Sequence, residues 1–231
     1  MKVDLHIHSA LSPCGSDDMT PNNIINMAGI CELDMISVCD HNTLGQQEVL
    51  GQVAKKLGMK YLYGVEVQSV EDVHVCGYFI NIEDAQKFDV YLKKHLLPIK
   101  NDVHFFGNQF LFNENDEVIG CEDILLIQSS MVSINDIAKK IHEYHGIVSL
   151  AHVCDKSNSI LTQLGFIPPN LEFDMIEVKN EKQKEMVMKM HPWIKDVLWI
   201  KNSDAHYLQD IGIYEDDVDE NEWNEMWRKR L

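Results

Sequence analysis

Residues 1–9 read MKVDLHIHS, with His6 and His8 on either side of a single isoleucine. Side chains alternate between two faces along a β-strand, so a strand here presents both imidazoles on one face. The apolar residues Val3, Leu5 and Ile7 are then expected on the opposite face. Such a strand is either half-exposed or presents a pair of ligands, and the rest of the sequence has to decide between these alternatives.

The composition limits the classes of protein to consider. A chain of 231 residues is long enough for one sizeable α/β domain. It contains 37 Asp and Glu against 20 Lys and Arg, and its formal net charge is −17. This charge repels nucleic-acid backbones and anionic membranes, so we expect neither long duplex nucleic acid nor a membrane among its partners. The sequence has no membrane-spanning apolar run and no signal peptide, which predicts a cytoplasmic protein.

Short apolar strands alternate with helical patterns along almost the whole sequence, which indicates a parallel sheet covered by helices. Glycine-rich phosphate-binding loops of the GxGxxG or P-loop kind do not occur, and this favours a β/α barrel over an open nucleotide-binding sheet. Residues 101–133 interrupt the alternation with two short strands around a turn at 113–116. We predict one domain over residues 1–231 with an insertion at about 101–133.

The insertion contains two pairs of phenylalanines, Phe105 with Phe106 and Phe110 with Phe112. They could line a substrate pocket or form a small satellite core. The satellite core is the preferred interpretation, because clusters of this kind commonly lie under long excursions of the chain.

The carboxyl ends of parallel strands in a β/α barrel meet on one face, where catalytic groups lie. Nearly every predicted strand closes with a residue type that binds metal ions. A single histidine on an apolar strand is more often a hydrogen-bonded core residue, but six coincident strand ends favour a metal centre. Imidazoles with a bridging carboxylate suit two or three divalent metal ions such as Zn, Fe or Mn. The residues concerned are His6, His8, Asp40, His41, Glu66, His74, His152, Asp204 and His206.

The stretches DLHIHS, SVCDHNT, YGVEV, VHVCGYF, SLAHV and NSDAHY follow one another between residues 4 and 207. With these motifs the sequence resembles the polymerase-and-histidinol-phosphatase (PHP) family of metal-dependent phosphoesterases. The resemblance implies an α/β fold, namely a distorted seven-stranded β/α (TIM-like) barrel. It also implies hydrolysis of a phosphate ester with a metal-bridging hydroxide as the nucleophile.

The resemblance further implies a trinuclear metal site. One ion takes His6, His8, Glu66 and Asp204, and a second shares Glu66 and adds His74 and His152. The third takes His41, His206 and one ligand from the turn after the first strand. That last position is often histidine in the family, and this sequence has Cys14 there. A thiolate ligand favours Zn or Fe over Mg or Mn, and an unliganded turn thiol is the alternative.

Proton transfer and substrate binding have fewer candidates. Asp40 is expected to orient a ligand histidine or to carry a proton, with a helix N-cap as the alternative. His206 shares the predicted proton role. Lys156 and Lys179 follow strand ends and are candidates for contacts with phosphate, because no arginine precedes Arg228. For either lysine taken singly, an ordinary surface role is the preferred interpretation.

The other candidates receive weaker assignments. Glu177 closes the predicted strand MIEV and is kept as a partner for a ligand, without a firm role. The remaining histidines are assigned ordinary structural roles. They are His95, His104, His142, His145 and His191.

The preferred function is hydrolysis of a small phosphorylated substrate, either a monoester or a nucleotide. The alternatives are a phosphodiesterase or nuclease acting on short oligonucleotides, a C–N or C–O hydrolase of the amidohydrolase type, and a metal-binding regulatory module without turnover. The intact ligand set weighs against the regulatory module. Substrate identity and oligomeric state do not follow from the sequence.

Overall fold

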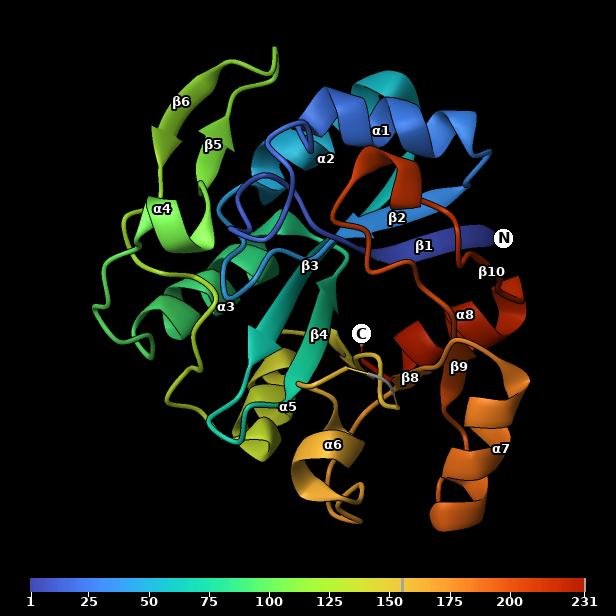
Figure 1. The fold of residues 1–231 in the computed structure, drawn as a ribbon. Coiled ribbons are helices and arrows are strands. Elements are labelled where there is room, and N and C mark those ends of the chain that lie inside the picture. Colours follow the sequence, from blue (N-terminus) through green and yellow to red (C-terminus); the bar gives the residue numbers. More distant parts are fainter. Residues whose placement is uncertain (155, 231) are drawn as a thin grey trace.

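Eight strands form one curved sheet in the computed structural model of the chain, which describes residues 1–154 and 156–230. Their order in the sheet is β10-β1-β2-β3-β4-β7-β8-β9. The segment after β9 returns to β1, where Ala205 donates to the His6 carbonyl at 3.2 Å and accepts from the His8 amide at 2.8 Å. The two edges of the sheet therefore meet, and the sheet is a nearly closed barrel (Figure 1). The strands are β1 (Lys2–Ile7), β2 (Met35–Val38), β3 (Lys60–Gln68), β4 (His74–Phe79), β7 (Ile147–Leu150), β8 (Met175–Glu177), β9 (Leu198–Ile200) and β10 (Asp216–Asp217).

The predicted distorted, seven-stranded barrel is confirmed, with the two-residue β10 added beside the start of β1. One part of the prediction is wrong, because the sheet is not parallel throughout. β4 runs antiparallel to both β3 and β7, since residues 69–73 form a tight hairpin that reverses the chain. His74 therefore begins its strand, but its pairing with Gln68 places it at the edge where β3 ends.

The first strand is irregular, and this corrects the expected alternation of its side chains. Val3 and Leu5 pack in the same core cluster as Cys76, whose sulfur lies 3.8 Å from His6 Nδ1. Ile7 instead packs with the cluster under the outer helices. The pairing between β1 and β2 shifts register after Asp4, as at a β-bulge. As a result the apolar residues before the shift and the histidines after it both face the barrel interior.

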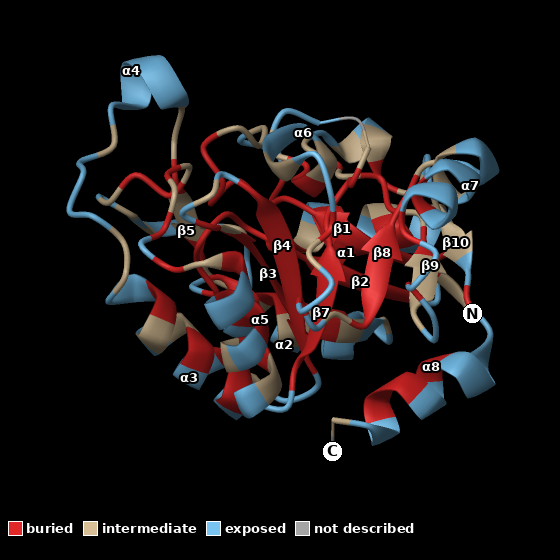
Figure 2. Cartoon of the chain, turned by 90° about the horizontal axis from the view of Figure 1, so that it is seen from below, coloured by how far each residue is buried: buried red, intermediate tan, exposed pale blue. Residues whose placement is uncertain are grey.

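Helices cover the outer face of the sheet, and the strands β1, β2, β4, β7 and β8 are buried along nearly all of their length (Figure 2). The predicted start of the first helix is confirmed: Thr20 caps it by accepting from the Asn23 amide, with Pro21 at its first position. Among the described residues, no helix has the length and apolar character needed to cross a membrane. The helices are α1 (Pro21–Ile30), α2 (Gln47–Leu57), α3 (Ile82–Lys93), α4 (Val103–Phe106), α5 (Ile134–Glu143), α6 (Ile160–Leu164), α7 (Glu181–Met190), the 3₁₀ turn η1 (Leu208–Asp210) and α8 (Glu220–Arg228).

The last helix closes the end of the barrel opposite the strand ends that carry the histidines. Trp223, Met226 and Trp227 of α8 are buried in the same cluster as Val3 and Leu5 of β1. Removing these large side chains from water is the main contribution of α8 to stability.

The insertion forms α4 and a separate two-stranded sheet of β5 (Phe110–Phe112) and β6 (Val118–Cys121), joined by the predicted turn. Phe112 is buried, and Phe110 packs beside it against the cluster under α1 and α2. Phe105 and Phe106 remain 79% and 36% exposed. The expectation of a satellite core is therefore wrong for the first pair, and the second pair joins the main core. The assignment of one domain with an insertion stays a prediction.

A partly buried ion pair joins Arg230, two residues beyond the end of α8, to Asp174 beside β8, and its removal should cause a measurable loss of stability. Asp174 accepts from Arg230 Nη2 at 2.7 Å and from His142 Nε2 at 2.8 Å. Burial would raise the pKa of Asp174, but His142 and Arg230 hold it below its usual value of 3.8. We expect Arg230→Ala to lower the free energy of unfolding by about 1–3 kcal/mol near pH 7.

The pH dependence of this loss has a defined sign. A depressed carboxyl pKa stabilises the folded state above pH 3.8, and this contribution disappears as the pH falls through the lowered value. The difference between wild type and Arg230→Ala in urea unfolding should therefore shrink in acid. Arg228→Ala removes the same charge from an exposed position and should change the stability by less than about 0.5 kcal/mol. Equal losses in the two variants would contradict the prediction.

Candidate metal centre

A cavity of about 190 Å³ lies at the edge of the barrel where β1, β2, β3 and β7 end and β4 begins. It contains most of the predicted ligands, which come from six different strands or the segments that follow them. His6 and His8 lie beneath its floor, fully buried. The lining residues are Cys14, His41, Glu66, Gln68, His74, Ile127, His152, Lys156, Ser157, Asn158, Asp204 and His206.

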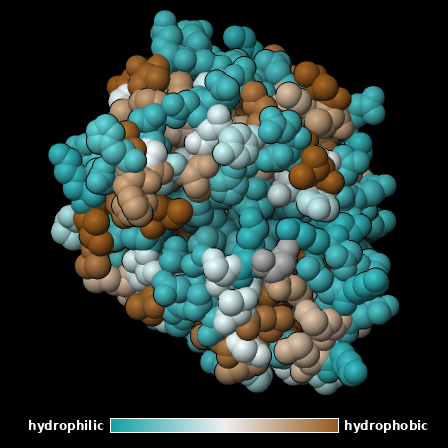
Figure 3. All heavy atoms as spheres, viewed as in Figure 1, coloured by the Kyte–Doolittle hydropathy of each residue, from teal (hydrophilic) through white to brown (hydrophobic). Residues whose placement is uncertain are grey.

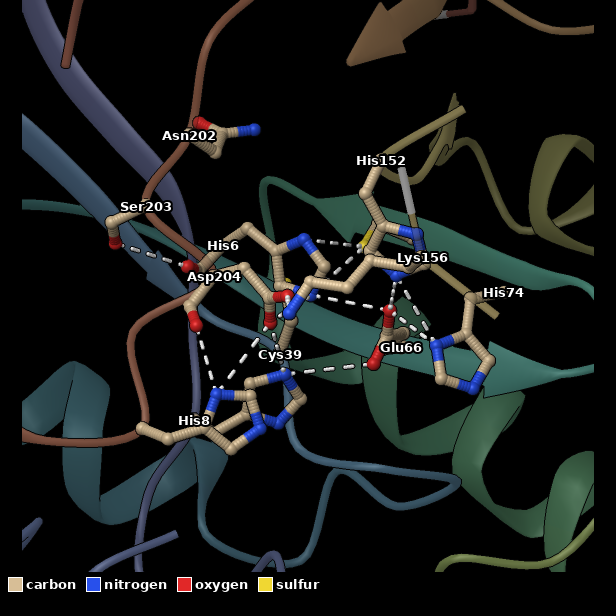
Figure 4. A network of polar contacts seen from close by, with 12 residues as sticks. His6, His8, Cys39, Glu66, His74, His152, Lys156, Asn202, Ser203 and Asp204 are labelled. Carbon is tan, nitrogen blue, oxygen red and sulfur yellow. Dashed lines mark hydrogen bonds and ion pairs between the residues drawn. The ribbon is translucent and has the colours of Figure 1, made fainter. Parts of the chain in front are cut away.

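Glu66 is the centre of the cluster and is almost completely buried. Figure 4 shows imidazole rings converging on its carboxylate from several sides. Burial alone would raise the pKa of Glu66, but the surrounding histidines, His74 and His6 foremost, lower it well below its usual range. Its Oε1 lies 3.3 Å from His6 Nε2, 2.9 Å from His74 Nδ1 and 3.1 Å from His152 Nε2, and its Oε2 lies 3.5 Å from His8 Nε2 and 3.1 Å from His41 Nδ1.

The two histidines of β1 are held by buried side chains behind them. His6 Nδ1 lies 3.0 Å from Glu177 Oε2, which directs His6 Nε2 toward Glu66. His8 Nδ1 lies 3.1 Å from Ser12 Oγ, and Ser12 in turn donates to Asp40 at 2.7 Å. Carboxylates that bind the far nitrogen of a ligand histidine fix its tautomer and ring orientation.

Asp40 accordingly lies one hydrogen bond behind the cluster. Its carboxylate accepts from the Ser9 amide and hydroxyl at 2.8 and 2.6 Å, and from Ser12. Gln46, rather than Asp40, occupies the N-cap position of α2, so the N-cap alternative for Asp40 is wrong. Its contact with His8 passes through Ser12, and this geometry matches the orienting role better than direct proton transfer.

Two further histidines have one ring nitrogen occupied and the other directed into the cavity. His74 Nε2 lies 3.3 Å from Gln68 Oε1, so its Nδ1 is left for Glu66. His206 Nδ1 lies 2.8 Å from the Asp204 carbonyl, which leaves its Nε2 available. The ring assignments follow from these partners, because a backbone carbonyl or an amide oxygen only accepts.

Cys14 lies with His8, His41 and His206 in a group whose candidate ligand atoms are all within 4.8 Å of one another. Burial favours the neutral thiol, but His41 and His206 outweigh it and lower the pKa of Cys14 to about 6. A thiol in this environment is largely a thiolate at neutral pH, the form that binds metal ions.

The backbone is held in uncommon conformations at the cluster. Asn42, His152 and Asp204 all have positive φ angles, of 52°, 30° and 53°. Such conformations are costly for residues other than glycine and persist where surrounding bonds impose them. The side-chain amide of Asn42 donates to two backbone carbonyls of the insertion at 2.7 and 2.6 Å. Beside Asp204, the backbone amide of Ser203 donates to the Asp4 carboxylate at 3.1 Å.

The donor set fits divalent metal ions. His8 Nε2 and His41 Nδ1 are buried and have no hydrogen-bond partner within the described part of the chain. Both atoms lie within 3.5 Å of Glu66 Oε2 without making a hydrogen bond to it, and a buried imidazole nitrogen in this state favours a metal ion as its ligand. Three groups have their candidate ligand atoms within 4.8 Å of one another. Each pair of groups has one residue in common, which is His8, His41 or Glu66. The groups are His8–Cys14–His41–His206, His6–His8–Glu66 and His41–Glu66–His74.

The remaining predicted residues divide between the cavity and other places. Lys156 lines the cavity, and its Nζ lies 3.0 Å from Asp204 Oδ2. Lys179 lies over the Tyr214 ring and is not among the lining residues that the structure describes, so its contact with substrate stays a prediction. Of the histidines assigned structural roles, His142 joins the ion pair with Asp174.

The sequence interpretation missed Gln68, Ser12, Asn202 and Ile127. Gln68 follows Glu66 by two positions in a strand, so strand periodicity could have placed it on the same face. Asn202 connects Glu177 at 3.2 Å with the Leu5 amide at 2.8 Å, which no local pattern reveals. Ile127 reaches the cavity from the insertion, and no sequence signal could have shown that.

Comparison with known proteins establishes the fold. No protein-family model matches the sequence. An uncharacterised protein of Methanocaldococcus jannaschii is 30% identical over 95 residues, which are 38% of this chain and 54% of that protein. A candidate metal-dependent phosphoesterase of Bifidobacterium adolescentis superposes with a TM-score of 0.65 over 99% of this chain and 96% of its own, at 16% identity. The chain has a PHP-type fold.

The lesion-specific endonuclease Q of Pyrococcus furiosus shares this PHP-type fold, with a TM-score of 0.64 and 17% identity. The similarity covers 97% of this chain but only 55% of the endonuclease. This chain thus spans about half the length of the endonuclease and of the archaeal relative.

One expectation about partners has to be corrected. The net charge of −17 predicts that long duplex nucleic acid is not a partner, and the sequence favours a small phosphorylated substrate instead. Endonuclease Q, solved in complex with a 27-mer duplex, superposes on 99% of this chain with a TM-score of 0.64. Net charge averages over the whole surface, whereas binding depends on the local field at the site, to which bound cations contribute. Duplex nucleic acid is therefore not excluded by composition.

The Gln68–His74 contact predicts a specific effect on metal binding. Gln68→Leu removes the acceptor of the His74 ring proton while leaving every candidate ligand in place. We expect the affinity for Zn, measured by competition with a chromophoric chelator, to fall about 10-fold. Gln52→Leu makes the same change on the exposed side of α2 and should leave the affinity unchanged. Unchanged affinity in Gln68→Leu would show that Gln68 does not hold His74.

Proposed function

We propose that the chain is a metal-dependent phosphoesterase. The observation that carries the proposal is the buried Glu66 carboxylate within 3.5 Å of five imidazole nitrogens, two of which have no hydrogen-bond partner in the described residues. Hydrolysis replaces the ester P–O bond with a bond from phosphorus to a water oxygen, and a proton passes to the departing alkoxide.

Two or three divalent ions, of Zn, Fe or Mn, would be held by the ligand sets that the family resemblance implies. Metal ions at such a site supply Lewis acidity toward phosphoryl oxygens and lower the pKa of bound water. The two oxygens of Glu66 face different groups of histidines, so this carboxylate would be suited to serve as a ligand shared by two metal ions. Cys14 favours Zn or Fe, because a thiolate is a soft ligand.

The chain's own groups contribute to binding and to proton transfer. Lys156 lies at the mouth, 3.0 Å from Asp204, and can move its flexible ammonium group onto a phosphate oxygen. His206 lines the cavity whereas Asp40 is fully buried behind it, so His206 is the better placed of the two to pass a proton to a leaving group. Asp40 acts by positioning His8 and the turn at Ser9 and Ser12.

A nuclease or phosphodiesterase is the second candidate. The observation in its favour is that endonuclease Q, whose structure contains a duplex with an abasic lesion, has this fold over nearly the whole of the present chain. The phosphate chemistry would be the same, and only the group beyond the scissile phosphate would differ.

The test is metal content by elemental analysis of anaerobically purified protein, together with phosphate release from monoesters and nucleotides and cleavage of single- and double-stranded oligonucleotides. We expect two or three ions per chain and hydrolysis of at least one class of ester. Close to three ions without turnover would favour a regulatory module or an amidohydrolase. Fewer than two ions after reconstitution with Zn, Fe or Mn would mean that the histidines are structural.

A matched pair of variants tests the role of Glu66. Glu66→Gln removes the shared charge, so we expect it to lower metal content by at least one ion and turnover by about 100-fold or more. Glu114→Gln makes the same change at an exposed turn of the insertion and should preserve both. Full activity in Glu66→Gln would rule out a bridging role for this carboxylate.

A further inference from the structure

The short helix α4 exposes two aromatic rings that contribute nothing to the protein core. Val103, Phe105 and Phe106 are 51%, 79% and 36% exposed, and none of the four residues of α4 is buried. The rings of Phe105 and Phe106 lie edge to face with their centroids 4.6 Å apart. Single exposed apolar residues are common, but adjacent exposed aromatic rings mark a contact surface.

The insertion does not need these rings in order to fold. Its other pair, Phe110 and Phe112, already packs against the cluster under α1 and α2. The helix itself is fixed by polar contacts, since Asp102 accepts from the His104 amide at 3.1 Å and Asn101 donates to the Gly107 carbonyl at 3.0 Å. Stability therefore does not explain why Phe105 and Phe106 face solvent.

The position of α4 connects the rings to the candidate metal centre. The helix ends at Gly107, whose φ is +104° and where any Cβ would collide with the Pro13 carbonyl, directly before Cys14. Asn108 donates to Asp17 at 3.0 Å, and the Phe110 amide donates to the Ala10 carbonyl at 2.9 Å. Three successive contacts thus seat α4 on the turn that supplies Cys14 to the cavity.

The surface views agree with this placement. Helix α4 stands out from the barrel on the same side as the segment leading into α6, whose residues Ser157 and Asn158 line the cavity (Figure 2). Apolar atoms gather over the insertion on the face seen in Figure 1, beside the polar centre of that face (Figure 3).

The charge around α4 limits what the rings can bind. Asp17 and Asp102 lie beside the helix, so this surface offers no electrostatic attraction for a phosphate. A flat apolar group gains binding energy at this point by stacking, which does not depend on cationic side chains. A nucleobase is such a group, because it is flat and stacks on aromatic rings without needing a cationic side chain. It would belong to an ester whose phosphate lies at the metal centre.

We infer that Phe105 and Phe106 form a stacking platform for a nucleobase of the substrate. This inference rests on the proposed phosphoesterase function and narrows it to nucleotide esters. The base comes from a free nucleotide or from a nucleic-acid strand, and the chemistry of stacking is the same in both.

The test compares esters with and without a base. Phe105→Ala should lower kcat/KM for adenosine 5′-monophosphate about 10-fold, mainly through KM, and leave glycerol 1-phosphate unaffected. Phe105→Tyr keeps an aromatic ring and should retain the wild-type value. Ile119→Ala truncates another exposed apolar side chain of the insertion, 65% exposed on β6, and should change neither substrate. Equal losses on both esters, or no loss on either, would overturn the platform.

Binding measurements separate the remaining outcomes. Calorimetric titration of metal-loaded protein with adenosine 5′-monophosphate and with a trinucleotide identifies the source of the base, because Phe105→Ala should weaken whichever one stacks. A wild-type protein that hydrolyses only glycerol 1-phosphate and binds neither base-containing ligand refutes the platform but keeps the phosphoesterase. Base-dependent binding without hydrolysis of any ester supports the platform and refutes the proposed function. A dimer in sedimentation that Phe105→Ala dissociates would assign the rings to a second copy and overturn the inference.

Discussion

Glu66 is a carboxylate taken almost completely out of water and surrounded by imidazole nitrogens. Neither the carboxylate nor the rings would be stable there alone, since an unpaired charge or polar atom in the interior is costly. Each depends on the others, and together they still leave His8 Nε2 and His41 Nδ1 without a hydrogen bond in the described residues, although both atoms lie within 3.5 Å of the carboxylate. The charge balance of the cluster thus calls for cations, and the surrounding fold serves to keep these groups in place.

A layer of polar residues behind the cluster holds the histidine rings in their orientations. Glu177, Ser12 and Gln68 each occupy the far nitrogen of one histidine, while Asp40 and Asn202 hold those residues in turn. Because these partners come from different strands, the orientation of each ring depends on closure of the whole barrel. His152 and Asp204 follow the ends of β7 and β9, and their strained backbone conformations accompany side chains that point into the barrel.

The sequence allowed the barrel and the gathering of ligands to be predicted because strand ends in a β/α barrel converge whatever the details. Details that arise from pairing could not be predicted. The register shift in β1 turned Val3 and Leu5 to the same side as His6, and a five-residue hairpin reversed β4. Neither the register shift nor the strand reversal alters the local hydrophobic pattern, so both become visible only in the pairing of the strands.

Closure of the barrel also sets an order of events during synthesis. The Ala205 backbone that pairs with His6 and His8, and the nearby Asp204, lie almost two hundred residues after these histidines in the sequence. Contacts so distant in sequence form late and slowly. During synthesis His6 and His8 therefore have Glu66 available early, but their other carboxylate partners, Glu177 and Asp204, are added much later. The complete set of candidate ligands therefore exists only after the segment that carries Asp204 and His206 has closed the barrel against β1.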